Sequence, residues 1–360
     1  MRRVLITTRL RTAPDGSWPF RTIPDHYGFG IGRFRTHGYE VVTATPPESG
    51  WTGALRRLPA DLGTRYGDLA FQAALWSERD GVDLIFDPWD VKGNALALAG
   101  LRLTRALRTP LVSYIHARPM SEWPTWQRPA RELFLAGCDG LAAMSSSVAD
   151  ELDSRPRWAR KTRLVVPGPD AEYYEPASRT GRDIVCVGKS LRDFETLGRA
   201  ATRTTARVHI VCPRSAVTPA FVRFGPNVTI TTADDRRLLP RSVIDPILRE
   251  ARAVAIPLST LGSMAGLWAL FDGLGFAKPV LMTRHPGVPV DIEAEGIGRW
   301  LGLRDEAGWA DALQYFEDNE DEAFAMGQRA RALVDGGLNS VTFAESMARV
   351  FDDVLDGKLG

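Results

Sequence analysis

The sequence predicts two doubly wound α/β domains of the Rossmann-like kind, and three observations carry this prediction. The chain has 360 residues, 44% of them hydrophobic and 25% charged, which is ordinary for a globular protein but too long for a single core. Short apolar runs alternate with longer amphipathic segments along most of the chain. The stretch VVPGPDAEYYEPASRTGRD at 165–183 interrupts both patterns, as an interdomain linker would.

The first half is expected to form a parallel sheet with helices on both faces. Its apolar runs lack polar alternation, which is typical of strands that are buried on both sides. We expect strands at 4–8, 40–44, 84–87, 111–116, 140–144 and 163–166, with helices that include DLAFQAALWSER and NALALAGLRLTRAL.

The second half repeats the same alternation. Strands are expected at 183–187, 207–212, 228–231, 253–257 and 279–283, and helices at DFETLGRAATRT, RSVIDPILREA, AGLWALFDGLGFA and WADALQYFEDN. The segment SVTFAESMARVFDDVLD predicts a final amphipathic helix. We therefore expect domains at 1–166 and 183–338, a linker at 167–182, and a C-terminal helix at 339–360 that packs back on the first domain. The carboxyl ends of both sheets should face a central cleft, where open α/β sheets bind ligands.

Composition excludes several classes of function. The net charge of +1 gives no basic excess for binding nucleic acid. Cys138, Cys186 and Cys212 lie far apart in apolar surroundings, which favours buried free thiols in a reducing compartment. The histidines show no metal-binding spacing, and no apolar run approaches the roughly 20 residues of a membrane span. The start MRRVLITTRL is interpreted as a strand rather than a signal peptide, so we expect a cytoplasmic protein without a metal.

The segment VCVGKSLRDFETL is a candidate anion site. An expected strand runs into Gly188, which permits a tight turn, and Lys189 and Arg192 follow before a helix that Asp193 is placed to cap. Two cations beside the amide groups of a helix N-terminus suit a diphosphate. The alternative is a capped surface helix whose basic side chains are only solvated.

The stretch AGLWALFDGLGFAKPVLMTRHPG contains a second candidate. Gly262 and Gly266 allow a loop whose amides point at a ligand, and the following helix directs its positive end to the same place. Asp272 lies under two turns along that helix, where it could meet sugar hydroxyls or a ribose. Alternatively, Asp272 is a helix-surface carboxylate paired with an arginine.

Two features of the first half complete the candidates. The glycines of YGFGIGRF, Gly28, Gly30 and Gly32, allow close approach of a backbone to a ligand, or form only a flexible turn before a helix. The spacing is not a dinucleotide-binding fingerprint. His116 ends an expected strand and would either point into the cleft or be a satisfied core histidine.

Taken together, these segments resemble the retaining nucleotide-sugar glycosyltransferases of the GT-B fold, especially glycosyltransferase family four. The likeness covers nearly the whole chain. VVPGPDAEYYEP resembles the family's linker, VGKSLRD the turn that supplies basic residues to the donor diphosphate, and AGLWALFDGLGFAKPVLMT the family's Gly-Leu, Glu-Ala-Met-Ala and Gly-Lys-Pro-Val signature. GIGRWLGLRDEAGWADAL resembles the segment that usually follows.

The resemblance implies roles for individual residues. Gly30 would lie near the sugar phosphate, and His116 would contact the transferred sugar. Lys189 and Arg192 would neutralise the diphosphate. Asp272 would take the place of the second glutamate of the family's pair, which binds the ribose. The full set of implied donor-binding residues is Gly30, Gly188, Lys189, Arg192, Ala265, Gly266, Leu267 and Asp272, with His116, Lys189 and Arg192 implied in catalysis.

The sequence departs from the family pattern at two places. Met264 stands where the first glutamate of the pair would lie, so the donor sugar must be contacted by other groups. Arg192 follows Lys189 by three residues, and Phe194 occupies the position of the usual lysine.

The resemblance implies an enzyme, a hexosyltransferase that moves a sugar from a nucleoside-diphosphate sugar to a hydroxyl of a glycan, lipid or natural product, with retention and without a metal. The first domain would bind the acceptor and the second the nucleotide sugar. The aromatic segments DGSWPFRTIPDHYGF and RPMSEWPTWQRP could stack on the acceptor, and peripheral membrane contact is left open. Two alternatives are a GT-B-type sugar-nucleotide epimerase and a non-catalytic sugar-nucleotide-binding protein.

Overall fold

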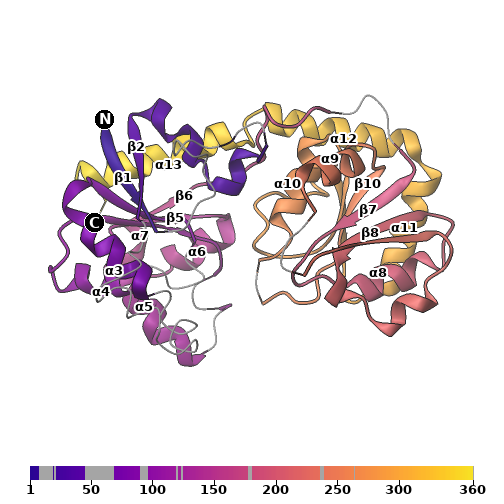
Figure 1. Ribbon diagram of the computed structural model, residues 1–360, viewed down its shortest axis with the longest axis horizontal. Coiled ribbons are helices and arrows are strands. Elements are labelled where there is room, and N and C mark those ends of the chain that lie inside the picture. The colour runs from indigo at the N-terminus through magenta and orange to yellow at the C-terminus, as the bar shows by residue number, and fades with distance from the viewer. Residues whose placement is uncertain are drawn as a thin grey trace. The chain divides into compact units, whose positions relative to one another are not determined.

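The computed structural model describes residues 1–7, 19, 22–44, 69–89, 96–118, 121–122, 125–176, 181–235, 239–262 and 264–359. The chain divides into two compact units, each of which is described by itself (Figure 1). The first unit comprises Met1–Pro19, Gly28–Pro167 and Ser340–Gly360, and the second comprises Phe20–Tyr27 and Gly168–Asn339.

The first unit is built on a 6-stranded sheet in the order β2-β1-β3-β4-β5-β6, and all of its strands are parallel. The strands are β1 (Arg2–Ile6), β2 (Tyr39–Thr43), β3 (Leu84–Asp87), β4 (Leu111–Ile115), β5 (Gly140–Ala143) and β6 (Thr162–Leu164). Strand β1 lies between β2 and β3, so the strand order reverses there. This is the kind of switch point at which open α/β sheets form ligand sites.

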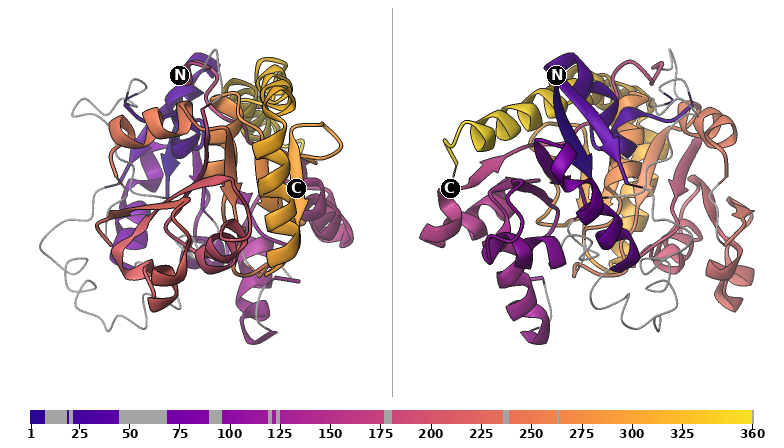
Figure 2. Two further views of the ribbon diagram at one scale, coloured as in Figure 1. Left: turned by 90° about the vertical axis from the view of Figure 1, so that its right-hand side faces the viewer. Right: turned by 60° about the vertical axis from the view of Figure 1, so that its left-hand side comes forward.

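Helices cover this first sheet. They are α3 (Leu69–Glu78), α4 (Leu96–Leu103), α5 (Arg128–Gly137), α6 (Ser146–Asp153), α7 (Pro156–Ala159) and α13 (Ser340–Leu355). The C-terminal helix α13, yellow in Figures 1 and 2, runs beside the first sheet. Its Phe351 ring lies 5.3 Å from the Phe34 ring and 5.2 Å from the Phe86 ring, measured between centroids. The end of the chain therefore completes the core of the unit that contains its beginning.

The second unit has a 6-stranded parallel sheet in the order β12-β11-β10-β7-β8-β9. Its strands are β7 (Asp183–Val187), β8 (Arg207–Pro213), β9 (Val228–Ala233), β10 (Ala253–Ile256), β11 (Val280–Thr283) and β12 (Gly298–Leu301). Its helices are α8 (Phe194–Ala201), α9 (Arg241–Arg249), α10 (Leu267–Gly275), α11 (Glu306–Asp318) and α12 (Glu320–Asp335). The strand order reverses between β7 and β10.

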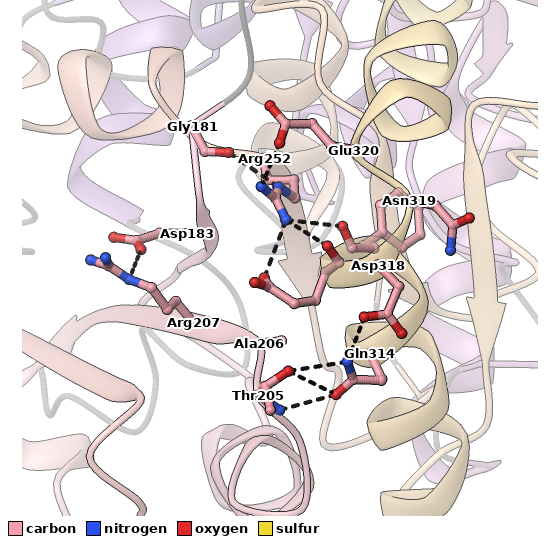
Figure 3. Close-up of polar contacts among 12 residues, drawn as sticks. Gly181, Asp183, Thr205, Ala206, Arg207, Arg252, Gln314, Asp318, Asn319 and Glu320 are labelled. Atoms are coloured by element: carbon pink, nitrogen blue, oxygen red, sulfur yellow. Dashed lines mark hydrogen bonds and ion pairs between the residues drawn. The ribbon is translucent and has the colours of Figure 1, made fainter.

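Arg252 shows how the elements of the second unit are joined (Figure 3). Its side chain, 5% exposed, donates to the carbonyl oxygens of Gly181 at 3.1 Å and Glu317 at 3.0 Å, and it pairs with Glu320 at 3.1 Å. The carbonyl of Glu317 belongs to the last turn of α11, where carbonyl oxygens lack N–H donors from the helix itself. One arginine thus joins the start of β7, the end of α11 and the start of α12.

The predicted fold class is confirmed, because each unit is a parallel sheet flanked by helices. Each of the expected strands overlaps an observed one, although residue 8 lies outside the described residues. Sequence reasoning missed the edge strand β12, whose residues GRWL are mixed in polarity and only partly buried. An edge strand needs no continuous apolar run, so periodicity gives it little signal. Helices α5, α6, α7 and α12 were not assigned from the sequence either.

Candidate functional site

Two loops meet at the switch point of the second sheet. The loop after β7 and the loop after β10 are hydrogen-bonded to each other, because Asp193 N donates to Pro257 O at 2.9 Å and Ser259 N donates to Leu191 O at 3.1 Å. Leu258 N also donates to Thr283 Oγ1, at the end of β11, at 2.9 Å. The structure therefore brings VGKSLRD next to the residues that lead into α10. The sequence analysis had treated these two segments as separate candidates.

Arg192 is a partly buried cation in the loop after β7. Its side chain folds over Gly188, where an added Cβ would lie 2.7 Å from Arg192 Cγ, so a larger residue here would displace the arginine side chain. Nη1 donates to Ser190 O at 3.0 Å. Its buried Nε has no acceptor, and no carboxylate pairs with Arg192, within the part of the chain that the structure describes. Burial lowers the pKa of Arg192, because a cation that is removed from water loses the hydration that stabilises its charged form.

Other charges surround this edge. Lys189 is exposed, immediately after Gly188. Asp235, which follows β9, accepts from Ser215 N at 2.7 Å, and this hydrogen bond, with the nearby charges of Arg214 and Lys189, lowers the pKa of the carboxyl. Lys189 and Arg214 therefore add positive charge at the carboxyl ends of β7 and β8.

The N-terminus of α10 presents backbone amides at the same edge. Gly266 is the N-cap residue, with φ of 90°, a left-handed conformation, and as a glycine it offers no side chain to cap the helix. An added Cβ at Gly266 would lie 2.6 Å from Ile256 Cγ2, so glycine is needed for both conformation and space. The predicted donor residues Ala265 and Leu267 flank it. An uncapped N-terminus of this kind has amide groups available for an anion.

Met264 occupies the place of the missing acid. Its thioether lies near the loop after β11, since an added Cβ at Gly287 would come 3.4 Å from Met264 Sδ. In that loop Gly287 N donates to His285 Nδ1 at 3.0 Å. A buried histidine thus lies beside the position from which the expected carboxylate is absent.

Asp272 lies in a different environment from the other predicted donor residues. Its side chain is 6% exposed and forms an ion pair with Arg241, at 2.9 Å between Asp272 Oδ1 and Arg241 Nη1. Tyr174 Oη also donates to Asp272 Oδ1, at 2.5 Å. The sequence analysis offered pairing with an arginine as the alternative role of Asp272, but on the helix surface. The observed ion pair is instead buried. Sequence reasoning did not identify Arg241 or Tyr174 as its partners.

In the first unit, His116 lies at the carboxyl end of β4. Its Nε2 lies 2.8 Å from Pro88 O, and its ring is surrounded by those of Phe29, Trp89 and Tyr114, with centroids at 5.5, 4.8 and 4.7 Å. Phe29 precedes Gly30, so the structure brings the glycine segment next to His116. Gly30 has φ of 71°, and an added Cβ would lie 3.0 Å from Phe343 Cδ1.

Asp87 is a polar residue at the switch point of the first sheet that sequence reasoning missed. It ends β3, is fully buried, and accepts hydrogen bonds from the hydroxyls of Thr7 and, at 3.3 Å, Ser113. Thr7 N in turn donates to Phe86 O at 3.0 Å, which continues the pairing of β1 with β3. An acid at the end of an expected strand was the available signal.

The described ranges contain no cluster of three or more His, Cys, Asp or Glu residues that could hold a metal ion. The three cysteines are free and buried. No described helix is both long and apolar enough to cross a membrane. Apart from Asp272, the predicted site residues form one group in each unit. His116 lies with Gly30 in the first unit, and Gly188, Lys189 and Arg192 lie with 265–267 in the second.

The sequence matches no protein-family model and no curated protein. Solved structures do match its fold over nearly the whole chain. HepE from Anabaena, in complex with UDP, superposes with a TM-score of 0.68 at 13% identity, covering 98% of this chain and 100% of HepE. Sucrose-phosphate synthase from Thermosynechococcus elongatus gives a TM-score of 0.72 at 15% identity, covering 99% and 100%.

A protein from Listeria monocytogenes described as a UDP-N-acetylglucosamine 2-epimerase gives 0.57 at 11% identity, covering 99% of this chain and 97% of that protein. At such low identities the likeness establishes architecture rather than activity. With its two parallel sheets, each reversing strand order at a switch point, the chain has the GT-B fold.

Proposed function

We propose that this protein is a glycosyltransferase that moves a hexosyl group from a nucleoside-diphosphate sugar to a hydroxyl acceptor on a glycan, lipid or natural product. The observation that carries the proposal is Arg192. Among the residues that the structure describes, no carboxylate pairs with its guanidinium and its buried Nε has no acceptor. Arg192 lies where the loops after β7 and β10 meet. A bound diphosphate would supply the missing negative charge.

The chemistry requires stabilisation of a leaving group. As the bond between the anomeric carbon and the phosphate oxygen breaks, negative charge grows on the diphosphate. Lys189, Arg192 and the amides at Gly266 and Leu267 would stabilise that charge, because they are in place before the reaction begins. The acceptor hydroxyl forms the new bond and its proton passes to the leaving phosphate oxygen. We propose transfer with retention and assign no metal to this step.

The remaining roles follow the family resemblance. His116 and Gly30 would contact the transferred sugar, and Ala265 and Gly188 would let the backbone approach the donor. The resemblance implies that Asp272 contacts the ribose of the donor, and this stays a prediction. HepE was crystallised with UDP, which makes UDP the first nucleotide to test.

A panel of UDP-, GDP- and dTDP-sugars, each incubated with the protein and followed by mass spectrometry, tests the reaction class. Slow hydrolysis of one donor to free sugar and nucleoside diphosphate is the expected result without an acceptor. An epimerised nucleotide sugar would instead identify an epimerase, whose fold this chain shares. Binding without turnover would identify a non-catalytic protein, for which Met264 in the acid position is the main argument.

Substitution of Arg192 tests the diphosphate assignment. Loss of a charge-assisted hydrogen bond to phosphate costs about 1.5–3 kcal/mol, so Arg192→Ala should weaken UDP binding about 10- to 100-fold in calorimetry. The matched control is Arg203→Ala, which removes an exposed positive charge just beyond the other end of α8. Equal affinities of the two variants, with both folded, would contradict the assignment.

A further inference from the structure

A buried polar cluster lies inside the second unit, where four segments meet. Arg241, the first residue of α9, is at its centre. Nη1 pairs with Asp272 of α10 at 2.9 Å, and Nη2 pairs with Asp245 at 2.6 Å. Nη1 also donates to Tyr27 Oη at 3.3 Å, and Nη2 donates to Tyr174 Oη at 3.5 Å. We call Arg241, Asp272, Tyr174, Tyr27 and His26 the Arg241 cluster.

The Asp272 carboxylate is held from two directions. Arg241 Nη1 contacts both of its oxygens, at 2.9 Å and 3.0 Å, and Tyr174 Oη donates to Oδ1 at 2.5 Å. The side chains of Arg241 and Asp272 are only 15% and 6% exposed. Burial alone would lower the pKa of Arg241, but Asp272 and the neighbouring tyrosines outweigh this effect and raise it. Removing Arg241 would leave Asp272 as a buried carboxylate without its cation, whereas removing Asp272 would leave Arg241 with Asp245 alone.

The same cluster holds the N-terminal segment that ends at Tyr27. Asp25 N donates to Asp170 Oδ2 at 2.9 Å, and Asp170 N donates to His26 Nδ1 at 3.2 Å. The His26 ring lies 5.3 Å from that of Trp268 and 6.0 Å from that of Tyr174, and the Tyr27 ring stacks on Trp268 at 5.2 Å. A segment from the beginning of the chain and a segment of the linker are thus bound to α10.

Tyr27 is the last residue of the segment that belongs to the second unit before the chain returns to the first. The next residue, Gly28, begins the part of the chain that belongs to the first unit and includes Gly30 and Phe29 beside His116. The glycine segment therefore leaves directly from a residue that α10 and Arg241 hold in place. The first turn of α10, where Trp268 stacks on Tyr27, also presents the N-terminal amides to which the proposed function assigns the diphosphate.

We propose that Asp272 and Arg241 are positioning residues rather than donor ligands: they fix Tyr27 and the linker on α10, and so set the point from which the glycine segment departs. This inference rests on the proposed donor role of the α10 N-terminus. Small displacements of groups that orient a substrate reduce turnover strongly while leaving most of the binding contacts intact. A ribose ligand would behave differently, since its loss removes a contact with the nucleotide.

The test uses the full-length chain with Asp272→Asn, Arg241→Met and the variant that carries both. We expect each single variant to lower kcat for donor hydrolysis at least tenfold, while the donor KM changes less than threefold. The double variant should recover part of the lost thermal stability, because neither Arg241 nor Asp272 is then a buried charge without the other, yet it should remain slow. Asp245 loses its ion pair with Arg241 in both variants that carry Arg241→Met, so the recovery is not complete. Asp311→Asn, an exposed carboxylate of α11, is the matched control.

Nucleotide binding separates the two roles of Asp272. The ratio of the affinities for UDP and 2′,3′-dideoxy-UDP should be the same in the wild type and in Asp272→Asn. Loss of that discrimination in the variant would overturn the inference and assign Asp272 to the ribose. Recovery of kcat together with stability in the double variant would also overturn it, because the role would then be structural only.

Hydrogen exchange tests, independently of activity, whether Asp272 and Arg241 fix the segment ending at Tyr27 and the linker on α10. The amides of Asp25, Tyr27 and Asp170 donate hydrogen bonds within these segments and should be protected in the wild type. In Asp272→Asn and Arg241→Met we expect their exchange to accelerate at least tenfold. Unchanged exchange at these amides would overturn the inference that Asp272 and Arg241 are positioning residues. A wild type that binds none of the nucleotides would instead overturn the proposed function.

Discussion

Lys278 is a buried amine in the second unit. It precedes β11 in the Lys-Pro corner, is 1% exposed, and its side chain makes no hydrogen bond or ion pair within the ranges that the structure describes. Burial, together with the nearby charge of Arg249, lowers the pKa of the ammonium to about 8, although Glu250 acts in the opposite direction. A desolvated charge without a partner opposes folding.

Replacing Lys278 with methionine should therefore stabilise the protein at pH 7. The unfolded chain binds the proton up to its usual pKa of about 10.4, so stability of the wild type rises with pH between about 8 and 10.4. Below pH 8 the penalty is constant, and it amounts to about 3 kcal/mol at most. Urea unfolding across this pH range should show Lys278→Met more stable at pH 7, with the gain shrinking towards pH 10.

The control for this prediction is Lys358→Met, which removes an exposed lysine paired with Asp356 at 2.9 Å. It should show no gain at pH 7. A Lys278→Met protein whose advantage is the same at pH 7 and pH 10 would show that better packing, rather than loss of the charge, produces the effect.

At the scale of single residues, the sequence predicted groups that act locally and missed those that act at a distance. Gly188, Arg192 and Gly266 were identified because a turn and a helix start are written in adjacent residues. The partners of Asp272 are Arg241, 31 residues away, and Tyr174, 98 residues away. Hydrophobic periodicity carries no information about such pairs, because it describes which face of an element is buried and not what that face meets.

At the scale of elements, α10 packs into the core of the second unit and also presents backbone amides at its start. Its nine residues are nearly all buried, and its N-cap residue is a glycine, which has no side chain to cap the first turn. Gly275 near its end allows the Tyr174 ring to pack, since an added Cβ would lie 2.4 Å from that ring. The helix was predicted from its apolar pattern, whereas β12 was missed because an edge strand can be short and partly exposed.

Gly266→Ala should damage this element at its start. The residue has φ of 90°, and a Cβ would lie 2.6 Å from Ile256 Cγ2, so alanine is strained in both backbone and packing. We expect a loss of about 1–3 kcal/mol in the free energy of unfolding, together with weaker UDP binding. Thermal unfolding and calorimetry measure the two effects.

Gly262→Ala is the matched control for Gly266→Ala. It lies in the same loop, where the closest atom to an added Cβ is Thr260 Oγ1 at 3.5 Å, an ordinary contact. This variant should retain the stability of the wild type. If the two variants were equally stable, the left-handed conformation of Gly266 would not be a requirement of the fold.

At the scale of the whole molecule, the chain passes between its two units four times, although each unit has its own core. One buried cluster includes Leu5, Ile85 and Leu141 of the first unit, and another includes Ile184, Ile210 and Leu281 of the second. The sequence predicted two domains from length and repeated pattern. It did not predict that the segment ending at Tyr27 belongs with the second unit, because that assignment depends on long-range side-chain contacts.

Separate cores predict that the units can be destabilised separately. Phe351 of α13 is fully buried and packs against the rings of Phe34, Tyr39 and Phe86 in the first unit, with centroids at 5.3, 5.3 and 5.2 Å. Phe351→Ala should cost about 3–5 kcal/mol, which corresponds to about 10 °C in the unfolding of a unit of this size. Arg349→Ala, on the exposed side of the same helix, should cost little.

Calorimetry with and without UDP then assigns each transition to a unit. A ligand at 100 times its Kd stabilises the part that binds it by about 2.7 kcal/mol. We expect UDP to raise one transition and Phe351→Ala to lower the other, because the proposed diphosphate site lies in the second unit and Phe351 in the first. If both changes moved the same transition, the two cores would unfold together, and the C-terminal helix would stabilise the nucleotide site as well as the first sheet.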